Sequence, residues 1–251
     1  MVSRVAAYVP GPTTTVPGSA ADKAGIVPGD IITEVNDEKI KSAKLAAFIQ
    51  CVGSREKGGR EYCSRICCPE MLKNVLTMKE RNPDLPIYVF YRDIMMTGFL
   101  EHYYTQARKA GAIFIRYEKD DPPKVEFKDG LPVITAYDHI LRENVTINAN
   151  ILSLSSGMEP NDVEDLQEVF GVEVDRDGFY QEADFKWRPV DFLKQGIFAC
   201  GLALSPRPVS EAIATANKAL SLVDPQNEVL TRWIRQNLEC YRAGMPCRAG
   251  M

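Results

Sequence analysis

The stretch LAAFIQCVGSREKGGREYCSRICCPEMLKNVLTMKERNPDLPIYVFY, residues 45–91, decides the fold of this chain. It opens with a short apolar run of buried-strand type and closes with another, IYVFY. Between the two, apolar side chains recur at helical spacing after Pro69, which suits a first helical turn because proline has no N–H to lose there. The stretch therefore predicts a strand, a cysteine-containing loop, a helix over 69–81 and a second strand.

The same alternation continues downstream. The further predicted elements are a helix over 99–111, a strand over 112–117, a hairpin over 124–137 with Asp129-Gly130 as its turn, a strand over 146–157, a short helix over 164–172, a strand over 196–201 and a helix over 208–223. Strands that alternate with helices at this spacing predict an α/β fold built on a doubly wound parallel sheet.

The composition is that of an ordinary globular protein, with 251 residues, 45% of them hydrophobic and 25% charged. The net charge of −4 is spread along the sequence, which argues against nucleic-acid binding, because that needs concentrated Lys and Arg. No apolar run approaches the roughly 20 residues that span a bilayer. The opening MVSRVAAYVPGPTTT is a poor secretory signal, and a cytoplasmic location is expected.

Seven cysteines need a chemical explanation. Four of them are crowded together and form the candidate ligand set: Cys51, Cys63, Cys67 and Cys68. Neighbours such as Cys67 and Cys68 cannot bridge without strain, which argues against a disulfide framework. Clustered cysteines in an intracellular chain indicate a metal site.

These four cysteines converge where a loop meets the N-terminus of the predicted helix. Unpaired N–H groups and the positive end of the helix dipole favour thiolates there. Positive charge is added by nearby basic residues: Arg55, Lys57, Arg60 and Arg65. Four thiolates also suit tetrahedral zinc, although the paired C-x2-4-C knuckles usual in structural zinc sites are missing. The spacing favours iron–sulfur and leaves zinc, or ordinary buried or reactive thiols, open.

Several segments resemble the flavoprotein A subunit of heterodisulfide reductases. They are FIQCVGSRE at 48–56, YCSRICCPEMLKNVLTMKERNPDLPIYVFYRDI at 62–94, ILSLSSGMEP at 151–160, DGFYQEADFKWRPVD at 177–191 and GIFACGLALSPRPVSEAIATANKAL at 196–220. The resemblance covers about residues 44–223 and rests above all on the long cysteine motif. Since that motif binds a 4Fe–4S cluster in the family, the resemblance implies that Cys51, Cys63, Cys67 and Cys68 do so here.

The core of that family is similar to thioredoxin reductase, of pyridine-nucleotide-disulfide-oxidoreductase type, with an FAD domain interrupted by a nicotinamide-nucleotide domain. Where that second domain would have a Gly-rich phosphate loop, this chain has cysteines and no G-x-G-x-x-G, so NAD(P)H binding is not expected. The YRD at 91–93 lies where such domains end their second strand and is interpreted as surface polar residues.

The FAD domain is expected to be incomplete, because its Gly-rich fingerprint is missing from the sequence. The resemblance implies flavin contacts in the carboxy-terminal part, at Gly157, Gly201, Pro208, Val209 and Ser210. Leu202 stands where many relatives have an acidic residue after the glycine. FAD is therefore expected to be shared with another chain, with a ligand-free strand–loop–helix as the alternative.

The amino-terminal segment GSAADKAGIVPGDIITEVNDEKI, residues 18–40, resembles the central stretch of a PDZ domain. A short helix over 20–24 and a strand over 31–35 are predicted in it. PDZ domains capture peptide carboxy-termini by β-augmentation, but neither the carboxylate loop nor the groove helix is evident. The alternative is a turn-rich extension packed on the sheet. The predicted organisation is 1–43 PDZ-like or turn-rich extension, 44–150 cluster-binding domain, 151–223 carboxy-terminal part of the FAD-type domain and 224–251 helical tail.

The leading hypothesis is an iron–sulfur electron-transfer subunit of a heterodisulfide-reductase-like complex, with flavin and iron–sulfur proteins as partners in an oligomer. No catalytic side chain is assigned, since His102 and His139 are interpreted as structural and Cys200 as a core residue. Cys240 and Cys247 are interpreted as ordinary thiols or as contacts to a partner's cofactor. The rival hypotheses are a zinc-stabilised or PDZ-like scaffold and a complete flavoenzyme.

Overall fold

The computed structural model describes residues 34–35, 38–39, 44–56, 58–161 and 163–223, together with the single positions 232, 235, 236 and 239. The chain divides into two compact units. The first comprises residues 1–59 and 66–157, and the second comprises residues 60–65 and 158–251. The first unit thus extends past residue 150, where the sequence placed a domain boundary.

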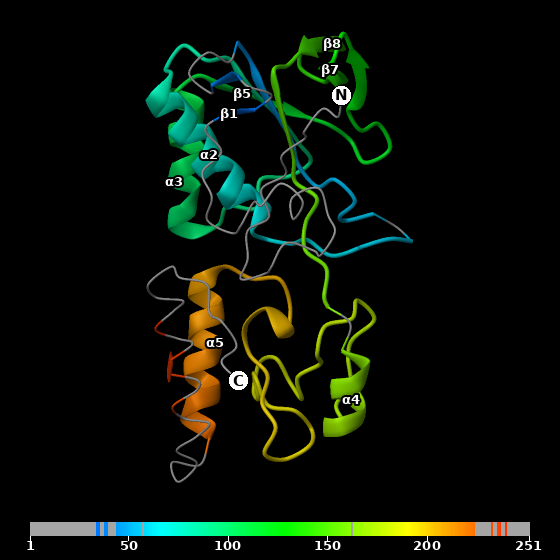
Figure 1. The fold of residues 1–251 in the computed structure, drawn as a ribbon, viewed down its shortest axis with the longest axis vertical. Coiled ribbons are helices and arrows are strands. Elements are labelled where there is room, and N and C mark those ends of the chain that lie inside the picture. The colour runs from blue at the N-terminus through cyan, green and yellow to red at the C-terminus, as the bar shows by residue number, and fades with distance from the viewer. Residues whose placement is uncertain are drawn as a thin grey trace. The chain divides into compact units, whose positions relative to one another are not determined.

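A four-stranded parallel sheet forms the centre of the first unit (Figure 1). Its strands are β3 (Ala46–Ile49), β4 (Ile87–Tyr91), β5 (Ala112–Arg116) and β9 (Ile151–Leu154). Their order is β5-β4-β3-β9, and every neighbouring pair is parallel. All four residues of β3 are buried, as its uninterrupted apolar sequence predicts for an inner strand. The predicted α/β fold with a parallel sheet is confirmed.

Helices α2 (Cys67–Arg81) and α3 (Glu101–Lys109) cover one face of this sheet (Figure 1). The chain enters α3 through a 3-10 turn at Gly98–Leu100. Buried side chains of α2, including Leu72 and Val75, pack on Phe48 and on residues of β4. The i, i+3 and i, i+4 spacing of these apolar residues is what places them on one stripe facing the sheet.

A three-stranded antiparallel sheet covers the opposite face. Its strands are β6 (Lys124–Lys128), β7 (Leu131–Asp138) and β8 (Glu143–Asn148). Ile134 of β7 and Ile147 of β8 pack against the parallel sheet in one apolar cluster. The predicted hairpin turn is confirmed: Asp129 and Gly130 both have positive φ, 53° and 80°, as a two-residue hairpin turn requires.

The prediction of one strand over 146–157 is wrong. The structure has two strands there, and they belong to different sheets: β8 lies in the antiparallel sheet and β9 in the parallel one. Asn150 separates them, because its side-chain Oδ1 accepts the backbone N–H groups of Lys44 and Leu45, at 3.1 and 3.0 Å. The apolar pattern alone does not reveal this long-range contact.

Over residues 60–65, 158–161 and 163–223, the second unit has the helices α4 (Glu164–Phe170) and α5 (Val209–Leu222) and a 3-10 turn at Gly201–Ala203. The described positions 232, 235, 236 and 239 are also helical. The strand predicted over 196–201 is wrong, since the segment forms a single β-bridge, Asp191 to Phe198. Its apolar side chains instead pack with Val190 and Leu204 in a small core.

The amino-terminal segment contributes β1 (Glu34–Val35) and β2 (Glu38–Lys39), which pair antiparallel. β1 falls inside the strand predicted over 31–35, whereas the helix predicted over 20–24 lies outside the described residues. Among the residues that the structure describes, no helix has the length and apolar character needed to cross a membrane.

Replacing Leu72 by alanine should lower the free energy of unfolding by about 3 kcal/mol, because Leu72 is fully buried between α2 and the sheet and the truncation leaves a cavity. Denaturant unfolding measures this loss. The matched control is Leu141→Ala, since Leu141 is 60% exposed and its truncation should change stability little. Equal losses in both variants would contradict the packing described for α2.

Candidate metal centre

Cys51 lies in the loop that follows β3, at the carboxyl end of the parallel sheet. Its φ of 62° is left-handed, as are those of Gly53 and Arg55, at 63° and 61°. Left-handed backbone is unfavourable for residues with a Cβ and persists only when surrounding contacts hold it. The loop therefore needs an anchor.

Arg92, directly after β4, is that anchor. Its side chain is 9% exposed and donates hydrogen bonds to the carbonyl oxygens of Cys51 at 3.1 Å and Arg55 at 3.3 Å, and also to that of Ser54. The interpretation of YRD as surface polar residues is thus wrong for Arg92. A guanidinium has five fixed donors, which is why one side chain can satisfy three carbonyls of a tight loop.

Cys68 is the buried member of the predicted ligand set, with 5% of its surface exposed. Its Sγ lies 3.5 Å from the backbone nitrogen of Met95, which donates to it, and 3.8 Å from the carbonyl oxygen of Asp93. The carboxylate of Asp93 also forms an ion pair of 2.7 Å with Arg55. The hydrogen bond between the two side chains raises the pKa of Arg55, so the Arg55 guanidinium stays charged beside the loop.

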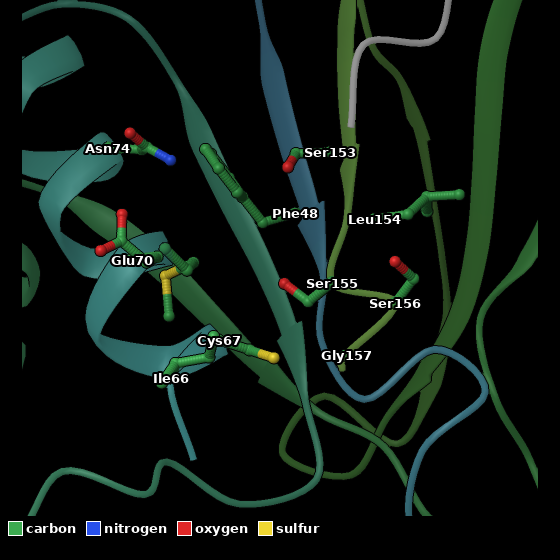
Figure 2. A pocket seen from close by; sticks show the side chains of 11 residues that line it. Phe48, Ile66, Cys67, Glu70, Asn74, Ser153, Leu154, Ser155, Ser156 and Gly157 are labelled. Carbon is green, nitrogen blue, oxygen red and sulfur yellow. The ribbon is translucent and has the colours of Figure 1, made fainter. Parts of the chain in front are cut away.

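Cys67 projects from the first turn of α2 into a pocket at the carboxyl edge of the sheet (Figure 2). The helix contributes Glu70 and Asn74 to the lining, and β3 contributes Phe48. The opposite wall is the run from Ser153 to Gly157, which begins in β9 and continues past its end. Gly157 has a φ of 81°, so the chain turns there in a conformation that favours glycine.

Cys63 lies on the segment 60–65, which belongs to the second unit. Tyr62 donates its hydroxyl to the carbonyl oxygen of Met158 at 2.6 Å, and the N–H of Met158 donates to Ser64 Oγ at 2.8 Å. The backbone N–H of Arg65 lies 3.3 Å from Cys63 Sγ and donates to it. The loop is thus fixed by contacts from both sides of the cysteine.

Arg65 forms a two-pronged ion pair with Glu211 in the first turn of α5, at 2.5 and 2.8 Å. Arg60 forms a second ion pair with Glu159, at 3.2 Å. The sequence treated these arginines as positive charge available to the cysteines. In the structure a carboxylate lies against each of them, so their net charge at the site is smaller than expected.

The part of the chain that the structure describes contains no group of three or more His, Cys, Asp or Glu side chains placed to hold a metal ion. The four predicted ligands are thiols that form no disulfide among the described cysteines. Their chemistry suits an iron–sulfur cluster, since backbone N–H groups already point at two of the sulfurs, Cys63 and Cys68. The ligand set itself stays a prediction, with Cys63 in the second unit and the other three in the first.

The predicted flavin residues lie at two places. Gly157 lines the pocket beside Cys67, and the others lie in the second unit, before and at the start of α5. There Gly201 has a φ of 66° and donates its N–H to Thr215 Oγ1 at 2.9 Å, which fixes the turn leading to the helix. Pro208 caps α5, and Val209 and Ser210 are exposed in its first turn. Cys240 and Cys247 lie outside the described residues.

Cys200 should react slowly with iodoacetamide, because burial raises the pKa of its thiol and the thiolate is the nucleophile. Arg207 partly offsets this shift, so Arg207→Gln should slow the reaction further. Because its pKa is raised, the rate at Cys200 should keep rising with pH beyond the range in which an ordinary thiol, with a pKa of about 8.5, has levelled off. Site-resolved mass spectrometry measures both rates, and an early plateau would contradict the burial.

Curated relatives match this chain over most of its length. It is 33% identical over 210 residues to the A subunit of the ferredoxin:CoB-CoM heterodisulfide reductase of Methanosarcina acetivorans, covering 80% of this chain and 26% of that protein. It is 34% identical over 200 residues to the A subunit of the H2:CoB-CoM heterodisulfide,ferredoxin reductase of Methanothermobacter marburgensis, covering 78% and 30%. A protein of Archaeoglobus profundus, named for its likeness to the heterodisulfide reductase A subunit, is 32% identical, covering 76% and 28%.

Two other comparisons concern parts of the chain. Residues 13–55 match the family model of a PDZ domain. Among solved structures, thioredoxin reductase of T. acidophilum superposes with a TM-score of 0.47 and 17% identity, covering 71% of this chain and 51% of that one. The chain spans about a quarter of the length of the curated relatives it matches.

Proposed function

Since this chain is a partial homologue of the heterodisulfide reductase A subunits, we propose that it is an electron-transfer component of a redox complex of that kind. The names of its relatives describe them as subunits, so partner proteins that carry flavin and iron–sulfur centres belong to the proposal. The matched region covers only 25–30% of the length of these relatives, and the donor and acceptor are therefore left to experiment.

The proposed centre is one 4Fe–4S cluster bound by Cys51, Cys63, Cys67 and Cys68. When bound, such a cluster accepts and releases single electrons at a potential set by its protein surroundings. The observation that carries the proposal is the long cysteine motif, of which Cys51, Cys67 and Cys68 lie at the carboxyl edge of the sheet. There Arg92 holds the Cys51 loop and a backbone N–H points at Cys68. Reduced thiols fit a cytoplasmic location, which we retain as an expectation.

We also propose that FAD, where present, is shared with another chain. Gly157, Gly201, Pro208, Val209 and Ser210 would contribute backbone N–H groups and a helix N-terminus to it. The left-handed turn at Gly201 supports this assignment, because it brings backbone without a side chain against α5, where the Gly201 N–H donates to Thr215 Oγ1.

The test is to purify the protein without oxygen and measure iron, acid-labile sulfide, zinc and released flavin per chain. Equal iron and sulfide, close to four of each, are expected for one 4Fe–4S cluster. The flavin content then separates an electron carrier from a flavoenzyme. Zinc without sulfide would contradict the proposal and favour a zinc-stabilised module.

The match of residues 13–55 to a PDZ domain favours a second candidate function, that of a peptide-binding adaptor. Titration with peptides that end in a free carboxylate tests it, because PDZ grooves bind that group by strand addition. Amidated versions of the same peptides serve as the control, and equal binding of both would contradict a PDZ mode.

A further inference from the structure

Gln50 is the residue before Cys51, and its side chain is fully buried. Neither Nε2 nor Oε1 of this amide has a hydrogen-bond partner among the described residues. Burying an unpaired amide costs free energy, and natural proteins rarely leave both of its polar atoms unpaired. Such a group at the edge of a candidate cofactor site needs an explanation.

The backbone of Gln50 is fixed on both sides. Its N–H donates to the carbonyl oxygen of Phe90 at 2.9 Å, so the residue continues the parallel pairing of β3 with β4. Its carbonyl oxygen accepts a hydrogen bond from the hydroxyl of Tyr117. Burial raises the pKa of Tyr117 to about 12, so the phenol remains a donor at neutral pH. The backbone of Gln50 is therefore held in place at the end of the sheet.

Strand alternation sets the direction of the amide. Side chains of a strand alternate between the two faces of a sheet, so Gln50 shares the face of Phe48, which packs against α2 (Figure 2). The first turn of α2 on that same face carries Cys67 and the buried Cys68. These residues all belong to the first unit, so the argument does not depend on Cys63.

We infer that the Gln50 amide is a positioning and tuning residue of the metal centre, which donates its N–H to a sulfur of the bound cluster. The inference rests on the proposed function and adds a residue to it. A hydrogen bond to sulfur stabilises the reduced cluster more than the oxidised one, because reduction adds negative charge to the sulfurs. Loss of the donor should therefore make the cluster harder to reduce.

The first test is Gln50→Met, which keeps the length of the side chain and removes the N–H. We expect the ratio of reduced to oxidised cluster at a given potential to fall about tenfold, which is about 59 mV for a one-electron couple. Gln106→Met is the matched control, because Gln106 is exposed on α3, and its potential should equal that of the wild type. An unchanged potential in Gln50→Met with the cluster still bound would overturn the inference.

A second readout does not require redox activity. In the iron-free protein, Gln50→Met should raise the unfolding temperature, since it replaces an unpaired buried amide by an apolar side chain of similar shape. With iron bound, the gain should disappear, because the amide then has its partner. Equal gains with and without iron would mean that Gln50 is merely structural.

A third measurement uses the wild-type protein, so it remains valid even if Gln50→Met does not fold. With glutamine labelled by 15N, pulsed electron paramagnetic resonance of the reduced cluster should show coupling to a side-chain amide nitrogen, and its absence would overturn the inference. These results can be distinguished from a failure of the proposed function. A wild type without iron and sulfide defeats both, whereas a normal cluster with no amide coupling and no shift in potential defeats the role of Gln50 alone.

Discussion

Replacing Cys67 by alanine is expected to abolish iron and sulfide binding and, with them, electron transfer. Cys67 is the first residue of α2 and one of four predicted ligands. A 4Fe–4S cluster needs a thiolate for each iron, so the variant would leave one iron without its protein ligand. The measurement is iron and acid-labile sulfide per chain after anaerobic purification, together with the visible absorption of the cluster.

Cys200→Ala is the control for this prediction. Cys200 is a free thiol in the small core of the second unit and is not a predicted ligand, so iron content should match the wild type. The iron-free forms of both variants should unfold much as the wild type does without iron. Full iron content in Cys67→Ala would refute Cys67 as a ligand.

Replacing Arg92 by methionine should lower the free energy of unfolding by about 4 kcal/mol. Three carbonyl oxygens, one in a buried and two in part-buried hydrogen bonds, lose their donor, and each unpaired acceptor costs about 1–3 kcal/mol. Water entering the site would recover part of that sum. Because the left-handed Cys51 loop also loses its anchor, iron should dissociate faster from the loaded protein. Denaturant unfolding and the rate of iron release to a chelator measure the two effects.

Arg81→Met is the matched control, since Arg81 is exposed in the last turn of α2 and contributes at most a favourable interaction with the helix dipole. That interaction is worth about 0.3–1 kcal/mol. If Arg92→Met is no less stable than Arg81→Met, the role of Arg92 as the anchor of the loop is refuted.

Local pattern and turn chemistry were sufficient to predict most of the first unit. The helix after Pro69, the strand IYVFY and the hairpin at Asp129-Gly130 each carry a short-range signal with a physical cause. The errors occur where a contact between residues far apart in the sequence decides where a strand ends. The side chain of Asn150 accepts hydrogen bonds from the backbone of Lys44 and Leu45 and so separates β8 from β9, and nothing in the residues around 150 predicts this.

In the candidate site, too, some residues could be predicted from the sequence and others could not. Cysteines are rare and chemically distinctive, so Cys51 and its companions could be selected from the sequence. Arg92 and Gln50 could not, because arginine and glutamine are common at surfaces and their roles depend on burial. One signal was available for Gln50: a polar residue continuing the apolar run AAFI is placed inside the sheet and needs a partner there.

The pairing of β3 with β9 has a consequence for synthesis in the cell. Leu45, directly before β3, is bonded to Asn150, directly before β9, and the two residues are 105 positions apart. At about 5–20 residues per second, the ribosome needs roughly 5–20 s to supply β9 after β3 has been made. During that time β3 presents a fully apolar strand with one unpaired edge, the kind of surface that aggregates. The nascent chain should therefore depend on chaperones that bind exposed strands until residue 154 has left the ribosome.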